Sequence, residues 1–178
     1  MIIPYTLQTF SDHSALICGG YAGQALEDMF RTFNGEMRME LIEPRCNAAS
    51  VMIDNKIWIV GGRKGAEDLE TSEFIFDYKA PELGPTLPFS ISNHGMVQYD
   101  DSKIYLIGGF QNGVRSKKTW IMNPKDNFKL TKGPELNESR TQHSCGKMKV
   151  NGKMVLVVAG GYHKSSQVWG NQKLIYIQ

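Results

Sequence analysis

Histidine and cysteine are the residue types in this chain best suited to metal binding or nucleophilic chemistry. The four histidines, His13, His94, His143 and His163, lie in separate loops or at strand starts, and none pairs with the spacing of metal ligands. His143 and Cys145 are two residues apart on a predicted strand, so their side chains share one face. Such a pair would serve as nucleophile and base or join a metal site, whereas packing is the simpler interpretation. We therefore predict no catalytic residue, no metal and no cofactor.

Glycines that follow apolar stretches raise a second chemistry, which is phosphate binding. No G-x-G-x-x-G or Walker spacing follows them, and no predicted helix start supplies a dipole, so nucleotide binding is not expected. The formal net charge is only +2, and the basic residues form no run beyond the pair Lys117-Lys118. A nucleic-acid partner is therefore not expected either, because such partners require a concentrated basic patch.

Hydropathy and cysteine usage indicate where the chain would work. No apolar run approaches the roughly 18 residues that a membrane helix needs. The first residues, MIIPYTLQTFSDH, lack the pattern of a secretory signal. The three cysteines are odd in number, which favours a reducing compartment without disulfides. We expect a cytoplasmic protein that has no membrane partner.

An apolar stretch that ends in two glycines recurs along the chain. The elements that contain it must position the histidine and cysteine side chains named above. It reads IWIVGG at 57–62 and IYLIGG at 104–109, and more loosely ALICGG at 15–20 and VLVVAGG at 155–161. The second glycines stand at 20, 62, 109 and 161, so the steps are 42, 47 and 52 residues. A period of this size predicts a repeat architecture. We divide the chain into units of about 1–44, 45–90, 91–139 and 140–178.

Each unit reads as a hairpin, a loop, a third strand and a fourth strand. Turns are predicted at Asp54-Asn55, Asp100-Asp101 and Asn151-Gly152. The middle strands are apolar on both faces, which is typical of a strand held between neighbouring sheets. Four-stranded units packed around an axis make an all-β propeller. We expect a degenerate strand in 25–33 and strands at 47–53, 56–61, 73–78, 95–99, 103–108, 118–122, 144–150 and 153–159.

These repeated features resemble the kelch repeat, and the resemblance covers nearly the whole chain. Departures are Phe128 in place of the tryptophan usual in the last strand, and a second unit without an aromatic residue between Pro81 and Pro88. The residues that carry the resemblance are Arg45, Gly61-Gly62 and Phe76-Asp77-Tyr78, then Asn93-His94, Gly108-Gly109, Trp120 and Phe128, then Arg140, His143 and Gly160-Gly161.

The resemblance implies a non-enzymatic scaffold that binds a partner protein or peptide through loops on one face. Family members often recruit substrates to ubiquitin ligases or bind actin. The alternative is a propeller enzyme of the copper-oxidase or sugar-isomerising kind. The positions implied for partner binding follow the glycine pairs or open the repeats, and they are Tyr21, Arg63, Phe110, Tyr162, Arg45 and Arg140. A competing interpretation is that the two repeat-opening arginines only hydrogen-bond backbone carbonyls.

Kelch-type propellers usually have six or seven blades, whereas four units are counted here. The N-terminal MIIPYTLQTF is β-prone and would supply a strand to the fourth unit, clasping a small ring. An open arc would instead expose apolar blade faces. We therefore expect a homodimer or an aggregation-prone chain, with a clasped monomer as the alternative.

Overall fold

The computed structural model describes residues 6–9, 15–20, 29–32, 38–76 and 79–163. The chain forms two compact units, Met1–Ser92 and Asn93–Gln178. Only strands, turns and loops occur in the described ranges, and no helix there is long and apolar enough to cross a membrane. The predicted all-β class is confirmed.

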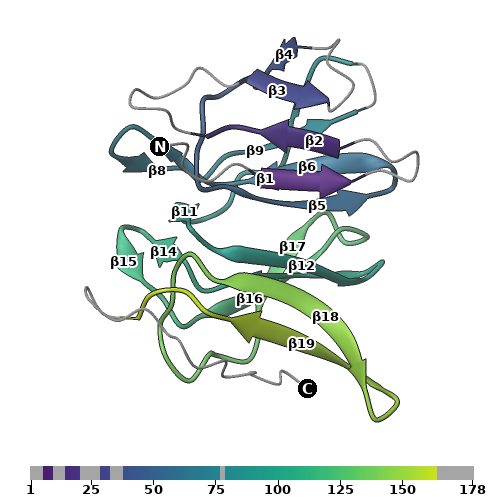
Figure 1. Ribbon diagram of the computed structural model, residues 1–178, viewed down its shortest axis with the longest axis vertical. Helices are drawn as coiled ribbons and strands as arrows, with labels where there is room; N and C mark the ends of the chain where they lie inside the picture. Colours follow the sequence, from purple (N-terminus) through teal and green to yellow (C-terminus); the bar gives the residue numbers. More distant parts are fainter. Residues whose placement is uncertain (1–5, 10–14, 21–28, 33–37, 77–78, 164–178) are drawn as a thin grey trace. The chain divides into compact units, whose positions relative to one another are not determined.

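The first unit contains two four-stranded antiparallel sheets (Figure 1). One is a simple meander in the order β1-β2-β3-β4. The other has the order β10-β9-β6-β5, so that β6 and β9 are central. The strands are β1 (Thr6–Thr9), β2 (Ala15–Cys18), β3 (Met29–Thr32), β4 (Arg38–Glu40), β5 (Ala49–Ile53), β6 (Lys56–Val60), β9 (Ser72–Ile75) and β10 (Glu82–Leu83).

The second unit repeats this plan in a sheet of order β12-β13-β16-β17, followed by the hairpin β18–β19. Its strands are β12 (Gly95–Asp100), β13 (Lys103–Ile107), β16 (Thr119–Asn123), β17 (Lys129–Lys132), β18 (Ser144–Val150) and β19 (Lys153–Ala159). Five further strands have two residues each. In the first unit they are β7 (Arg63–Lys64), β8 (Glu67–Asp68) and β11 (Ile91–Ser92), and in the second they are β14 (Phe110–Gln111) and β15 (Val114–Arg115).

The strands expected from the sequence are confirmed within two or three residues at each end. The strand expected at 73–78 ends at Ile75, and residues 77–78 lie outside the described residues, as do 25–28 and 33 of the degenerate strand that contains β3. Asp54 and Asn55 have φ of 46° and 61°, so both central residues of that turn have the positive φ that type I′ requires.

The turn expected at Asp100-Asp101 lies one residue later. The register changes between Gln98 and Asp100, which leaves Tyr99 as an extra residue in β12. Asp100 then pairs with Lys103 as the last residue of the strand, and its Oδ1 accepts hydrogen bonds from the Ser102 backbone N–H and Oγ at 2.8 Å each. Burial raises the pKa of Asp100, but these bonds together with Lys103 outweigh it and lower the pKa below its usual value. The sequence alone gives no sign of the bulge.

Apolar residues of the middle strands form the core of each unit, as the two-sided apolar pattern predicted. In the first unit, Ile57 and Ile59 of β6 pack with Leu41 and Ile75, and none of the four is more than 6% exposed. Burying each such side chain contributes about 1.5–3 kcal/mol. The core of the second unit joins the β12–β13 sheet to β19 and contains Val97, Tyr105, Ile107, Leu136, Leu156 and Val158.

The glycine pairs sit where the backbone of the following repeat approaches. The backbone N–H of Gly62 donates to the carbonyl of Ile91 at 2.8 Å, and that of Gly109 donates to Arg140 at 2.9 Å. The first glycines of these two pairs, Gly61 and Gly108, have φ of 59° and 61° and lie against the same two carbonyls, so a Cβ at Gly61 would overlap the Ile91 oxygen. Glycine is thus required twice over, by conformation and by space.

Gly61 and Gly65 allow these two requirements to be separated, because both have φ of +59°. Among the described residues nothing lies within 4 Å of a Cβ built on Gly65. We expect Gly65→Ala to cost about 1–2 kcal/mol through the backbone conformation alone. Gly61→Ala should cost at least about 1 kcal/mol more, because the carbonyl of Ile91 must move. Urea unfolding of both variants measures the difference, and equal losses would show that the close approach is unimportant.

Candidate functional site

Arg45 lies inside the first unit and is 2% exposed. Its Nη1 donates to the carbonyl oxygens of Gly61 at 2.6 Å and Thr71 at 3.1 Å. Its Nη2 donates to Thr71 Oγ1 at 3.2 Å and to Glu73 Oε1 at 2.7 Å, and its Nε donates to the carbonyl of Glu43 at 3.3 Å. The guanidinium therefore joins the start of the repeat, the glycine pair and the central strand β9.

Glu73, the partner of this arginine, is completely buried. Its two carboxylate oxygens also accept hydrogen bonds from the backbone N–H groups of Ile42 at 2.8 Å and Glu43 at 3.0 Å. A buried carboxylate is tolerated only when its charge is paired and its lone pairs are used. Arg45 and these two amides meet both conditions, so the chain before β5 is fastened to β9.

Arg140 repeats part of this arrangement in the second unit. It is 2% exposed, and its Nη1 donates to the carbonyl of Gly160 at 2.9 Å. Gly160 opens its glycine pair as Gly61 opens the earlier one, so the two arginines make equivalent bonds. Their burial favours the hydrogen-bonding role over direct contact with a partner, because a side chain sealed from solvent presents no surface.

The residues after the glycine pairs are more accessible. The Arg63 side chain is 37% exposed, and its Nε lies 3.1 Å from Asp68 Oδ1 across the β7–β8 pairing. Phe110 is half-buried at the start of β14, and the guanidinium of Arg115 lies 5.5 Å from its ring centroid. Tyr162 is 39% exposed. Tyr21 lies outside the described residues.

A small hairpin follows directly after the second and third glycine pairs, and each of its two strands has two residues. The first hairpin is β7–β8 and the second is β14–β15 (Figure 1). We call these the two small hairpins. Their tips are exposed, and Val114 in the second tip is 68% exposed. The sequence pattern predicts polar loops in both places, although the Asn112-Gly113 pair is typical of a tight hairpin turn. These residues have φ of 50° and 73°, as a type I′ turn requires. Val114 and Arg115 were missed for this reason.

The structure brings some of the predicted site residues together and leaves others untested. Arg45 and Arg63 belong to the first unit, whereas Phe110, Arg140 and Tyr162 belong to the second. Within the second unit, Arg115 of the small hairpin donates from Nη1 to the carbonyl of His163 at 3.2 Å, which is next to Tyr162. Phe110 and Tyr162 are therefore linked through Arg115. A single face containing all six residues stays a prediction.

The buried His94 and His143 and the partly buried Cys145 lie next to Gly95 in the second unit. Burial, and after it the nearby His143, lowers the pKa of His94 to about 3. Burial, and after it the charge of Arg140, lowers the pKa of His143 to about 4. Burial raises the pKa of the Cys145 thiol to about 12 although Arg140 opposes the change. All three groups are uncharged at neutral pH, so the arrangement favours packing over thiolate chemistry.

The remaining histidines add no metal site to the described part of the chain. His163 Nδ1 lies 2.9 Å from the carbonyl oxygen of Ser139, and His13 lies outside the described residues. No group of three or more histidine, cysteine or acidic side chains in the described ranges could hold a metal ion.

The comparisons with known proteins fit this geometry. A model of the kelch motif matches residues 44–80, which include Arg45, the glycine pair and Glu73. Residues 44–80 therefore carry a kelch motif. The chain is 30% identical over 105 residues to the kelch repeat and BTB domain-containing protein 2 of cowpox virus strain Brighton Red, and 29% identical to that of strain GRI-90 / Grishak. Each match covers 55% of this chain and 19% of the relative.

The kelch motif places the buried network in its structural setting. The matched segment contains β5, β6 and β9, and the network joins the segment's opening arginine to its glycine pair and its third strand. The sheet β10-β9-β6-β5 is therefore built mainly from the matched kelch motif, and the small antiparallel sheets of the described residues fit a segment of a kelch-type propeller. The two small hairpins emerge from these sheets directly after the glycine pairs.

The buried ion pair of the second kelch repeat can be compared with an exposed pair of similar length. Arg45→Met or Glu73→Gln should each destabilise the protein by about 3–5 kcal/mol, because each leaves one buried charge alone. The double variant should lose less than the sum. Lys117→Met is the matched control, because the pair Lys117–Glu135 is 2.8 Å long but half-exposed, so its loss should change stability far less. Additive losses in urea titrations would contradict this account.

The two buried histidines predict a loss of stability in acid. Their pKa values are lowered in the folded state, so below about pH 6.5 the unfolded chain binds protons that the folded chain does not. Stability should therefore be constant above pH 6.5 and fall between pH 6.5 and 4, by up to about 1.4 kcal/mol per pH unit for each histidine. Ala48 stands at the equivalent repeat position, so the double variant His94→Ala, His143→Ala should flatten this slope. An unchanged slope would contradict the prediction.

Proposed function

We propose that this chain is a non-enzymatic protein-interaction module whose two small hairpins contact a partner protein or peptide. The observation that carries the proposal is their construction. Each begins at a glycine pair that is hydrogen-bonded to the next repeat, and each presents an exposed tip. Short loops held by a rigid sheet are the usual places for recognition residues.

The residue types at these hairpins support recognition. Arginine and aromatic side chains contribute most often to protein-binding hot spots, and Arg63, Phe110 and Arg115 supply both kinds. Val114 adds an exposed apolar side chain beside them. The stacking of Arg115 on Phe110 limits the rotamers of both, which reduces the entropy lost on binding.

The six predicted site residues take different parts in this proposal. Arg63, Phe110 and Tyr162, together with Tyr21, would touch the partner. Arg45 and Arg140 would act through the backbone, because each holds the first glycine of its repeat in place. The dimer expected from the sequence is kept as part of the proposal, and light scattering measures it.

A role in ubiquitin-ligase substrate recruitment is the preferred form of this module, in the cytoplasm. It is favoured over actin binding by the relatives, whose names join kelch repeats to a BTB domain. The chain spans about a fifth of the length of those relatives, at 19%, so the role concerns the module and not a whole ligase. Copurification of ligase components would favour recruitment, whereas cosedimentation with filaments would favour actin binding.

A pull-down with paired variants tests the module. We expect Arg63→Ala or Phe110→Ala to weaken capture of a specific partner at least tenfold, a loss of about 1.4 kcal/mol, because each removes a hot-spot side chain. The control is Lys153→Ala, an exposed residue beside the turn at the opposite end of β19 from its glycine pair, and it should capture normally. Quantitative mass spectrometry of bound proteins gives the comparison. Equal capture by all variants would contradict the proposed surface.

A further inference from the structure

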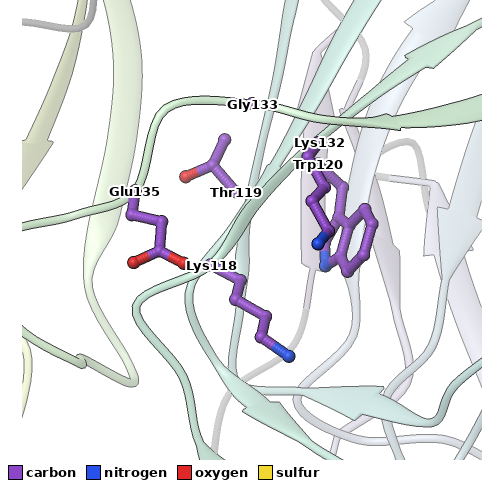
Figure 2. Close-up of a pocket in the computed structure, with 6 residues that line it drawn as sticks. All are labelled: Lys118, Thr119, Trp120, Lys132, Gly133 and Glu135. Carbon is purple, nitrogen blue, oxygen red and sulfur yellow. The ribbon is translucent and has the colours of Figure 1, made fainter.

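A small hollow lies beside the second of the small hairpins, between β16 and the chain that follows β17. Its volume is about 40 Å³, and Figure 2 shows the six residues that line it. At roughly 10–15 Å³ for each water-sized group, it has room for about three heavy atoms. This is the size of a carboxylate and far too small for a nucleotide. The lining residues are Lys118, Thr119, Trp120, Lys132, Gly133 and Glu135.

Thr119 supplies a buried hydroxyl that has no hydrogen-bond partner among the described residues. It is 1% exposed, its Oγ1 is buried, and the residue is one of the six that line the hollow. A buried polar group left in this state destabilises the folded protein. A ligand that accepts a hydrogen bond from Thr119 would remove that destabilisation.

In the preceding sheet, the hydroxyl at the position equivalent to Thr119 has a hydrogen-bond partner. Ser72 begins β9 as Thr119 begins β16, and the carbonyls of both accept a hydrogen bond from a glycine N–H at 2.8 Å, from Gly84 and Gly133 respectively. Ser72 Oγ donates to the carbonyl of Pro85 at 2.6 Å. The equivalent hydroxyl of Thr119 makes no such bond, although the residue lines the hollow.

Positive charge surrounds the hollow. Three lysines stand against one acidic residue, which gives a local charge of 3 − 1 = +2 from Lys117, Lys118, Lys132 and Glu135. The pKa of Glu135 is lowered mainly by a hydrogen bond from Lys117, and further by the charges of Lys117, Lys118 and Lys132. Glu135 is already paired with Lys117 at 2.8 Å. Lys118 and Lys132 make no ion pair in the described structure and line the hollow.

Trp120 connects the hollow with the proposed recognition hairpin. Its Nε1 donates to Gln111 Oε1 of β14 at 3.2 Å, which holds the indole against the small hairpin. Lys132 is its register partner on β17 and lies beside it in Figure 2. Trp120 therefore lines the hollow and is also hydrogen-bonded to the strand that carries Phe110.

We propose that this hollow receives the carboxylate of an acidic side chain from a protein partner, with Thr119 donating a hydrogen bond and Lys118 and Lys132 supplying the charge. This inference rests on the proposed function and names the chemistry of one partner group. The partner therefore carries an aspartate or glutamate next to the segment that meets the second small hairpin. A phosphorylated serine shares the anionic character, and the experiment separates the two.

The test uses a fluorescein-labelled hexaglutamate peptide and fluorescence anisotropy with the full chain at 50 mM salt. Thr119→Val keeps the shape and removes the hydroxyl, so it should weaken binding about tenfold while leaving the melting temperature unchanged or higher. Lys132→Gln should weaken binding several-fold. Glu135→Gln should tighten it, because it removes the carboxylate that stands among the described residues lining the hollow.

Lys129→Gln is the matched control, because Lys129 lies on the same strand, is paired with Asp126 and does not line the hollow. It changes the net charge as Lys132→Gln does and should alter binding less than twofold. Equal losses in these two variants, unchanged binding by Thr119→Val, or no binding to the wild type would overturn the proposal. Tighter binding of a phosphoserine peptide, also lost in Thr119→Val, would overturn the choice of carboxylate.

The outcomes also separate this inference from the proposed function. Normal partner capture by Thr119→Val, together with loss of capture in Phe110→Ala, would reject the hollow and keep the interaction surface. Hexaglutamate binding that depends on Thr119, without capture of any protein partner, would reject the proposed function instead.

Discussion

The ion pair between Arg45 and Glu73 is the interaction on which the first unit's kelch blade depends. Both side chains are almost completely buried, so their charges would be very costly without each other and without the surrounding hydrogen bonds. The pair engages backbone groups at residues 42, 43, 61 and 71. Three separate segments are thereby held to one strand, and the glycine pair is placed where the small hairpin must begin.

In the next repeat both members of this ion pair are replaced by uncharged residues, Ile91 and Trp120. Ile91 stands where Arg45 stands in the repeat, since its carbonyl accepts the same glycine N–H bond that the carbonyls of Arg45 and Arg140 accept. Trp120 stands at the register position of Glu73. Both charges are absent together, which avoids a lone charge in the core. The kelch blade therefore tolerates an ionic or an apolar solution at this place, provided that both positions change.

Much of the fold could be predicted from the sequence because the signals are local. Each apolar run, each Asn-Gly or Asp-Asn turn and each glycine pair is formed by residues only a few positions apart, and the pattern then recurs along the chain. The burial of Arg45 could not be predicted in this way. Its partner Glu73 is 28 residues away, and neither position carries a pattern that announces the pairing.

The candidate site was predicted only in part, for related reasons. The sequence indicated the positions after the glycine pairs, and Arg63, Phe110 and Tyr162 are indeed accessible there. The hollow at Thr119 was not foreseen, because it depends on a hydroxyl that lacks the partner Ser72 has in the previous blade. A missing bond leaves no mark in the sequence.

The pairing pattern of the strands also bears on how the chain acquires its structure. The hairpins β5–β6 and β18–β19 join strands separated by two residues, and β16 returns to β13 after a short excursion through the small hairpin. Contacts of such short sequence separation form quickly, because little chain must be closed into a loop. During synthesis each blade would complete its own sheet soon after its last strand leaves the ribosome, before the following blade exists.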